Sequence, residues 1–483
     1  MSRGSPPRSP SPRKRGDARR SSGGRPSRSG EPAALQLGTL LAELAEPEIL
    51  RRRSAVHRLG KLANPRARAA LERALADPDP GVRLGAAAAL GTLRHRGSRR
   101  ALEKHLNDPD WPVRAQVAYA LSRLAEPASA SLLADRLLQD GSALVRNACA
   151  MALGHIGDPR TIPALDHALH DESDRVRREA VLALERTGDP DAATKVRPFL
   201  NDPARRVRIA AAVVLGVRRD RSSVSALLRR LEESDVWERP ALIIALGRIA
   251  APESTPALVR AAHDAMRSVR VCAVHALALM RSPLAREVAR AGLTDRAWSV
   301  RGAAALALGQ VGSAADAPAL RPLLHDPHPW PRRGSIYALG RLGAGASLPE
   351  IRVALDEPDP EVRLAAVWAL GNLGDTRSQV KLVQMLRQTR PHSTGAGHTL
   401  SAGEGAVRLV SDADHRIFDA LVEAVGSLVL RSRDPLAEEA LREAKRDLSP
   451  EELDRPARLP VPVAAGKAGP TLRALFERVT PRP

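Results

Sequence analysis

Aromatic residues and cysteines are scarce in this sequence. Its 483 residues include three Phe, two Tyr, five Trp and two Cys. The two cysteines, Cys149 and Cys272, cannot build a disulfide framework, so we expect a reducing compartment and a cytoplasmic location. A core with so few rings must be built from alanine and leucine instead.

Long apolar runs are also missing. No stretch approaches the ~18–20 consecutive apolar residues that span a bilayer, so no membrane span is expected. The N-terminal segment carries charge but has no apolar core of its own, which argues against a signal peptide.

The first thirty residues hold nine Lys or Arg and one acid among Ser, Pro and Gly. Such a segment buries too little apolar surface to offset its ordering entropy, so residues 1–32 are predicted to be a disordered basic arm. The arm either binds nucleic acid or an acidic surface, or is a solubilising tail, which we favour. Removing its eight net charges lowers the formal charge of +20 to +12.

The rest of the chain repeats one phrase about every 31 residues, as in DPDPGVRLGAAAALGTL at 77–93. We count positions in each unit from one arginine, the ladder arginine. An acid lies six residues before it in every copy, and a leucine lies 23 residues after it in ten of eleven copies. Columns that stay in phase at this period predict a solenoid. The ladder arginines are Arg52, Arg83, Arg114, Arg146, Arg177, Arg208, Arg239, Arg270, Arg301, Arg332 and Arg363.

Each unit is predicted to contain two helices. In residues 159–170, Ile162, Leu165 and Leu169 follow helical spacing and predict a first helix. A possible N-cap four residues before the ladder arginine starts the second helix. These caps are Asp79, Asp110, Ser142, Ser173, Asp235 and Asp359. Position +8 is Gly in eight of eleven copies, which suits close approach to a neighbouring backbone.

The motif D-P-x-x-x-V-R-x-x-A-x-x-A-L-G resembles the HEAT-repeat superfamily, and most closely the short HEAT-like units of phycobilin lyases. The resemblance implies an all-α, right-handed α-solenoid of about 11–12 two-helix repeats. It says little about activity, because the family includes scaffolds, lyases, DNA glycosylases and metal-dependent hydroxylases.

The period defines the expected domain organisation. A HEAT-like repeat array at 33–388 follows the arm at 1–32, and the period then fails in a Gly/Ser/Thr-rich stretch, predicted to be a flexible insertion loop at 389–412. A degenerate C-terminal repeat and cap is expected at 413–448. Residues 449–483 are read as a Pro-rich tail with a short helix.

The acid and arginine columns are interpreted as a structural ladder rather than a phosphate-binding stripe. Each acid can accept amides at the start of a second helix while holding an arginine of its own or the next unit. Equal numbers of both signs leave no net field. The ladder residues are Asp77, Arg83, Asp108, Arg114, Asp140, Arg146, Asp171, Arg177, Asp202, Arg208, Asp264, Arg270, Asp295, Arg301, Asp326 and Arg332.

Two irregular columns on the second helices are the candidate binding residues. Positions +5 and +9 face away from the apolar side of the helix, and the family resemblance implies that this is the concave surface. An apolar and aromatic stripe flanked by basic residues suits a protein or peptide of acidic character; the alternative is that +5 side chains pack onto neighbouring units. The candidates are Tyr119, Met151, Ile244, His275, Tyr337 and Trp368 at +5, and Arg123, Arg186, Arg248 and Arg341 at +9.

Four tryptophans, Trp111, Trp237, Trp298 and Trp330, begin second helices at the turn edge. A ring in this place can pack adjacent units together, which we favour, or can contact a partner on one rim of the solenoid.

Catalytic motifs are not evident. The sequence has no Walker loop, no Gly-x-Ser-x-Gly elbow, and no His-Glu dipeptide of the kind through which HEAT-fold hydroxylases bind iron. His392 and His398 lack other ligands at metal spacing. We therefore expect a non-enzymatic scaffold or adaptor without a cofactor or metal. Two alternatives are a nucleic-acid-binding protein that uses the arm and the +9 arginines, and an enzyme related to the lyases or hydroxylases.

Overall fold

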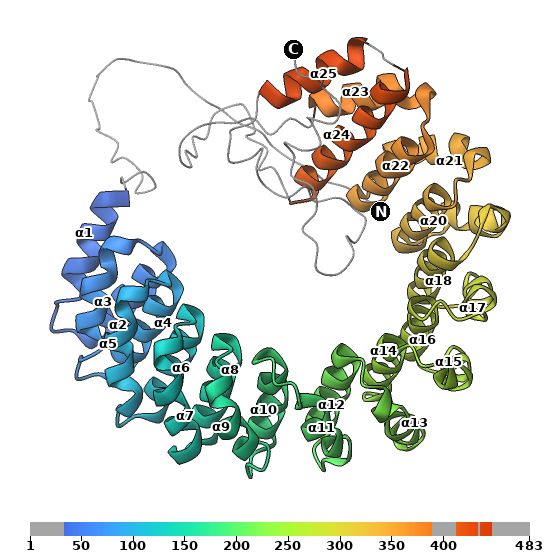
Figure 1. Cartoon of the computed structure of the whole chain (residues 1–483). Coiled ribbons are helices and arrows are strands. Elements are labelled where there is room, and N and C mark those ends of the chain that lie inside the picture. Colours follow the sequence, from blue (N-terminus) through green and yellow to red (C-terminus); the bar gives the residue numbers. More distant parts are fainter. Residues whose placement is uncertain (1–32, 389–411, 433–434, 447–483) are drawn as a thin grey trace, which may run out of the picture.

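The computed structural model describes residues 33–388, 412–432 and 435–446. Every regular element in these ranges is a helix. The helices form successive pairs along a C-shaped stack that has α1 and α25 at its two ends (Figure 1). The fold is therefore the expected all-α solenoid. The predicted arm, insertion loop and Pro-rich tail lie outside the described residues.

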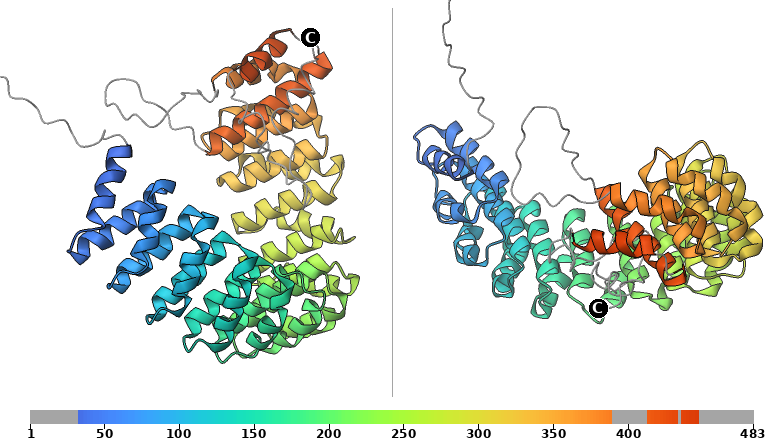
Figure 2. Two further views of the ribbon diagram at one scale, coloured as in Figure 1. Left: turned by 60° about the vertical axis from the view of Figure 1, so that its left-hand side comes forward. Right: turned by 90° about the horizontal axis from the view of Figure 1, so that it is seen from above.

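The second helix of each pair lines the inner, concave side of the arc (Figure 1). Consecutive second helices pack side by side, and the other views show the same order (Figure 2). They are α2 Ile49–Leu62, α4 Pro80–Leu93, α6 Trp111–Leu124, α8 Ala143–Ile156, α10 Asp174–Arg186, α12 Arg205–Arg218, α14 Arg239–Ile249, α16 Arg267–Leu279, α18 Trp298–Val311, α20 Pro329–Arg341, α22 Pro360–Leu373 and α24 Asp412–Ser432.

The first helices form the outer layer. They are shorter than the second helices, and most are preceded by a short 3₁₀ turn. These helices are α1 Ala33–Glu43, α3 Arg68–Ala74, α5 Arg99–Lys104, α7 Ala130–Gln139, α9 Ile162–Ala168, α11 Ala192–Val196, α13 Val224–Glu233, α15 Thr255–Ala261, α17 Ala285–Gly292, α19 Ala317–Leu320, α21 Leu348–Val353 and α23 Gln379–Gln388.

The predicted N-caps are only partly right. Asp79 and Asp359 accept amide hydrogens from the first turn through their carboxylates, whereas Asp235 accepts the amides of Trp237 and Glu238 in the turn before α14, whose N-cap is Glu238. Asp110, Ser142 and Ser173 stand at the N-cap position but make no side-chain cap bond. In those units, as in the Asp79 unit, the ladder acid six residues before the arginine accepts the N–H of the cap residue.

The ladder arginines join neighbouring units. Arg83 donates to both carboxylate oxygens of Asp108 in the next unit, at 2.7 and 2.9 Å. Its remaining Nη1 donates to the carbonyls of Asp77 and Pro78 in its own turn. Asp108 in turn accepts the Asp110 amide at 2.9 Å. Each arginine therefore closes its own turn and also bridges to the following one.

The same arrangement repeats along most of the array, with the arginine of each unit bonded to the acid of the next. The further pairs of this type are Arg52–Asp77, Arg114–Asp140, Arg146–Asp171, Arg177–Asp202, Arg239–Asp264, Arg270–Asp295, Arg301–Asp326 and Arg332–Glu357.

One unit departs from the ladder. Arg208 pairs with Glu238 and not with Glu233, the acid that stands in the column. Glu238 is fully buried one residue before the ladder arginine Arg239, and it also accepts from Arg230. The α14 helix correspondingly begins at Arg239, about one turn later than its neighbours. Most other units have a valine at the position of Glu238, and the buried carboxylate that replaces it here is the partner of Arg208.

Glycine at +8 sets the spacing of the second helices. A Cβ added to Gly247 would lie 2.6 Å from the Ala276 Cβ and 2.8 Å from its Cα. Gly91, Gly154 and Gly340 likewise face an alanine of the next unit at about 3 Å or less. The absence of a side chain therefore lets adjacent helices approach closely.

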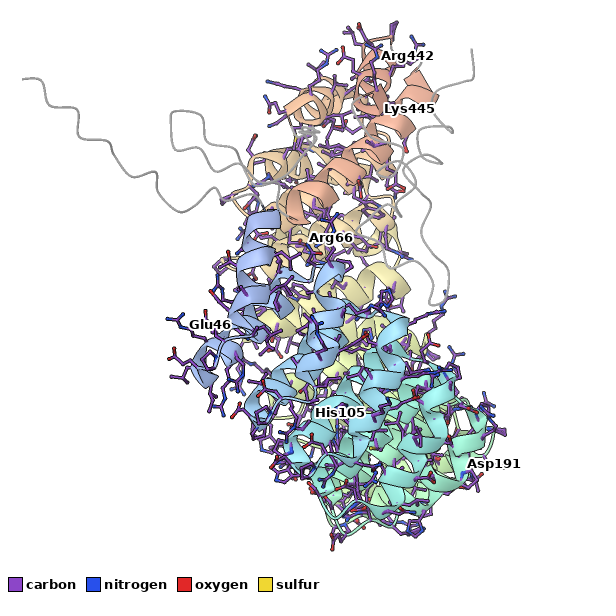
Figure 3. All side chains as sticks on the ribbon, turned by 90° about the vertical axis from the view of Figure 1, so that its left-hand side faces the viewer. Glu46, Arg66, His105, Asp191, Arg442 and Lys445 are labelled. Carbon is purple, nitrogen blue, oxygen red and sulfur yellow. The ribbon has the colours of Figure 1, made fainter. Side chains whose placement is uncertain are left out.

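The C-terminal end of the described chain is closed by an extra helix. The irregular twelfth pair, α23 and α24, is followed by α25, Pro435–Arg446, which packs on both. Its Ala437, Ala440 and Leu441 are buried. Arg442 and Lys445 point outward at this end of the arc (Figure 3). The helix thus covers the last apolar surface and presents a charged face.

Candidate functional site

The concave face of the arc is made by four columns of the second helices, at positions −2, +1, +5 and +9. All +9 side chains of the eleven regular units are exposed. At +5 every side chain except Tyr337 is exposed or half-buried. The columns therefore form a continuous surface along the inner side of the second helices (Figure 1).

The +9 side chains lie over the +8 glycine of the preceding unit. Arg341 donates its Nε to the Gly309 carbonyl at 3.1 Å, and Asn372 donates to Gly340 at 2.8 Å. The side chains of Arg123 and Arg186 pass near Gly91 and Gly154. Glycine leaves these backbone positions uncovered, so the +9 side chains extend along the concave surface.

The charges of this face are mostly of one sign. The four columns of the eleven regular units contain ten Lys or Arg and one acid, Glu361. Five of these basic residues are ion-paired: Arg53 with Asp79, Arg178 and Arg186 with the buried Glu179, Arg206 with Asp174, and Arg333 with Glu361. The ten basic residues are Arg53, Lys61, Arg123, Arg175, Arg178, Arg186, Arg206, Arg248, Arg333 and Arg341.

The +5 candidates differ in how much surface they offer. Tyr337 stacks on Trp368 of the next unit, with ring centroids 4.5 Å apart, and only 9% of its surface is exposed. Trp368, Tyr119, Met151 and Ile244 are half-buried. Trp368 is thus the accessible ring of the stacked pair, while Tyr337 supports it from beneath.

His275 is an exposed member of the +5 column. Desolvation by its neighbours and the charge of Arg248 lower its pKa, so the imidazole is held in its neutral form. It therefore adds little to the positive charge of the face.

The four turn-edge tryptophans divide into two kinds. Trp298 stacks on His328 of the next unit at 3.8 Å, and Trp330 covers Gly302 of the preceding unit. These two rings join units, although Trp298 is still 39% exposed. Trp111 and Trp237 are exposed to 45% and 68%.

Six exposed large apolar side chains in the four columns are not among the +5 and +9 candidates chosen from the sequence. Val217 and Leu279 occupy +9 positions and are 45% and 47% exposed. An apolar residue in this otherwise polar column was the available signal. The other four are Leu50, Leu144 and Trp237 at −2 and Val213 at +5.

The described ranges offer few groups that could support catalysis or metal binding. No group of three or more His, Cys, Asp or Glu residues there could hold a metal ion. Burial raises the pKa of the Cys149 thiol, which makes it a poor nucleophile. Ser122 and His155 are hydrogen-bonded at 2.6 Å, but the serine is buried between helices at a +8 position.

No helix in the described ranges is long and apolar enough to cross a membrane.

Solved structures of other solenoids resemble this fold. Yeast importin-beta (Kap95p) matches 93% of this chain and 67% of its own, with 13% identity and a TM-score of 0.52. Kap95p in a structure with RanGDP matches 93% of this chain and 66% of its own, with 13% identity and a TM-score of 0.49. The chain thus spans about two thirds of the length of these importin-beta chains. An Escherichia coli protein, YIBA, shares 22% identity over 53% of this chain and 99% of its own, with a TM-score of 0.40.

In a comparison with curated proteins, none matches this sequence. The family model for HEAT repeats matches residues 36–122, 76–153, 130–216, 194–270, 261–340 and 317–396, which together span most of the chain. The protein is a member of the HEAT-repeat family.

Proposed function

We propose that this protein is a non-enzymatic scaffold or adaptor that binds a protein or peptide of acidic character along its concave face. The observation that carries the proposal is the segregation of charge: ten basic residues and one acid share four columns with the apolar +5 stripe. A surface of this kind attracts an acidic partner and offers apolar area for its side chains.

Half-buried side chains of the +5 column supply the contacts of this proposed site. Tyr119, Met151, Ile244 and Trp368 each expose part of an apolar surface in a different unit. Contacts spread over several units suit an extended partner surface. Tyr337 acts through Trp368, on which it stacks.

Arg123 and Arg248 are the most useful charges for testing this face. Both are exposed, and no ion pair forms with either among the described residues. Arg186 and Arg341 are exposed as well, but Arg186 is held by Glu179 and Arg341 by a backbone carbonyl. The first two arginines can be replaced without breaking an internal contact.

The experiment is affinity capture with the Arg123→Glu/Arg248→Glu double variant, followed by mass spectrometry. We expect the partner recovered with the unaltered protein to be lost. The matched control is Arg100→Glu/Arg229→Glu, which reverses two exposed arginines that form no ion pair within the described part of the chain, on the outer helices α5 and α13. The control should retain the partner, and equal recovery by both variants would remove the proposal.

Nucleic acid is the main competing ligand, because phosphates also favour a basic surface. The apolar +5 stripe is a poor surface for a phosphate backbone, which favours a protein. Gel shifts with a steep dependence on salt, reduced when residues 1–30 are deleted, would support nucleic acid instead. Stoichiometric iron in the purified protein would support an enzyme related to the hydroxylases.

A further inference from the structure

Four of the six exposed large apolar side chains in the concave columns lie in the middle of the arc, and the other two, Leu50 and Leu144, stand apart on α2 and α8. Val213 and Val217 lie on α12, Trp237 lies in the turn before α14, Ile244 lies in the middle of α14, and Leu279 lies on α16. We call these five residues the mid-arc patch. Four of the five are more than a third exposed, Val213 at 39% and Trp237 at 68% among them. Exposed apolar side chains grouped over three neighbouring helices mark an interaction surface.

Four of the five arginines in the concave columns of α10, α12, α14 and α16 lie at one side of this patch. The preceding helix, α10, presents Arg175, Arg178 and Arg186, and Arg206 follows on α12, whereas the fifth, Arg248, lies within the patch at the +9 position of α14. Arg175 has no ion-pair partner among the described residues. The −2, +1, +5 and +9 columns of α10, α12, α14 and α16 contain no acid. The complementary ligand therefore has apolar side chains followed by acidic ones.

The side chains around the patch also limit which backbone conformation the ligand can adopt. From α12 to α16, the concave columns contain no Asn or Gln side chain. An extended peptide lying on this wall would leave many backbone N–H and C=O groups without protein partners, whereas an α-helix satisfies its own. The spacing of the units also fits a helical ligand. Adjacent helices of the stack pack ~8–10 Å apart, and seven residues of a ligand α-helix advance about 10.5 Å.

We propose that the mid-arc patch binds an amphipathic α-helix of the partner, lying along the arc with its acidic end beside α10. This inference rests on the proposed function and specifies the form and position of the ligand. One apolar side chain about every seven residues would contact each successive unit. The helix-in-groove mode then explains why apolar area is concentrated over three units and basic charge lies beside it.

The test is a selection of binders from a library of random 16-residue peptides on the full chain. We expect enriched sequences with apolar residues at spacings of three, four and seven and with acidic residues toward one end. Fluorescence anisotropy then measures their affinity for Val217→Glu/Leu279→Glu. We expect at least tenfold weaker binding, because two charges enter the apolar contact.

The matched control is Val353→Glu/Val380→Glu, which places the same charges at exposed positions on the outer helices α21 and α23. This variant should bind like the unaltered protein. Unchanged affinity of Val217→Glu/Leu279→Glu, enrichment of sequences without helical spacing, or no enrichment would each overturn the inference. Peptides that lose affinity for Arg123→Glu on α6 but not for Val217→Glu/Leu279→Glu would leave the concave face as the site and remove only the mid-arc patch.

Discussion

At the scale of single residues, the ladder arginine performs two structural tasks with one planar group. In Arg83, Nη1 donates to two carbonyls of its own turn, and Nε and Nη2 donate to the Asp108 carboxylate of the next unit. The fixed fork of a guanidinium makes this geometry possible, and a lysine could not reproduce it. The arginines of the ladder are therefore committed to stacking, whereas Arg123, Arg175 and Arg248 in the concave columns form no ion pair among the described residues.

Asp295→Asn should destabilise the protein. The substitution keeps the shape of the side chain but leaves the buried Arg270 guanidinium, which has no other ion-pair partner among the described residues, without a counter-charge. Breaking such a pair costs about 3 kcal/mol. Denaturant unfolding measures the loss. Glu438→Gln, which breaks an exposed pair with Arg442 on α25, should change the free energy of unfolding by less than about 1 kcal/mol. Equal effects would show that the ladder adds no more than a surface pair.

The ladder carboxyls should also make stability depend on acid pH. Burial alone raises the pKa of Asp108, Asp140 and Asp171, but hydrogen bonds from the arginine and a turn amide outweigh it, so each pKa is lowered overall. A lowered folded pKa stabilises the fold above the unfolded value of about 4 and loses that contribution as the pH falls further. The hydrogen bond from Arg53 holds the pKa of Asp79 at about 2, so the loss extends to that pH. Melting temperatures should fall between pH 4 and pH 2; a constant or rising value contradicts this account.

At the scale of helices, most of the structure could be predicted from the 31-residue period of the sequence. The columns placed the second helices, their apolar side and the small residue at +8, because those features depend only on neighbours at fixed offsets. Asp110 and Ser142 lie at the N-cap positions as predicted, but neither caps its helix through the side chain, and the Asp110 carboxylate pairs with Arg83 of the preceding unit instead. The late start of α14 could not be foreseen either, since it depends on where Glu238 finds its arginines.

Gly247→Ala should lower stability, because the new methyl would meet the backbone of Ala276 and force two second helices apart. Overpacking of this kind costs about 1–3 kcal/mol. Thermal and denaturant unfolding measure the change. Gly38→Ala on α1 is the control, since nothing lies within 4 Å of its added Cβ. That variant should be neutral or slightly more stable through helix propensity. Similar losses in both variants would argue against a close-packing role for position +8.

At the scale of the whole molecule, the sequence predicted a solenoid and the two columns that face inward, but not the exposure of individual side chains. Exposure depends on contacts between units. Tyr337 is covered because the next unit places Trp368 over it, while Trp237 is uncovered. The balance of charge on the concave face likewise emerges only when four columns are read together on the curved stack.

The central claim is that a partner occupies the concave side of this stack. Site-specific photo-crosslinking tests it most directly, with the reactive side chain placed at Met151 or Leu306 on the inner face, or at Val353 or Val380 on the outer helices. We expect the captured partner to crosslink from the two inner positions and from neither outer one. Crosslinks that form only from the outer positions would contradict the claim.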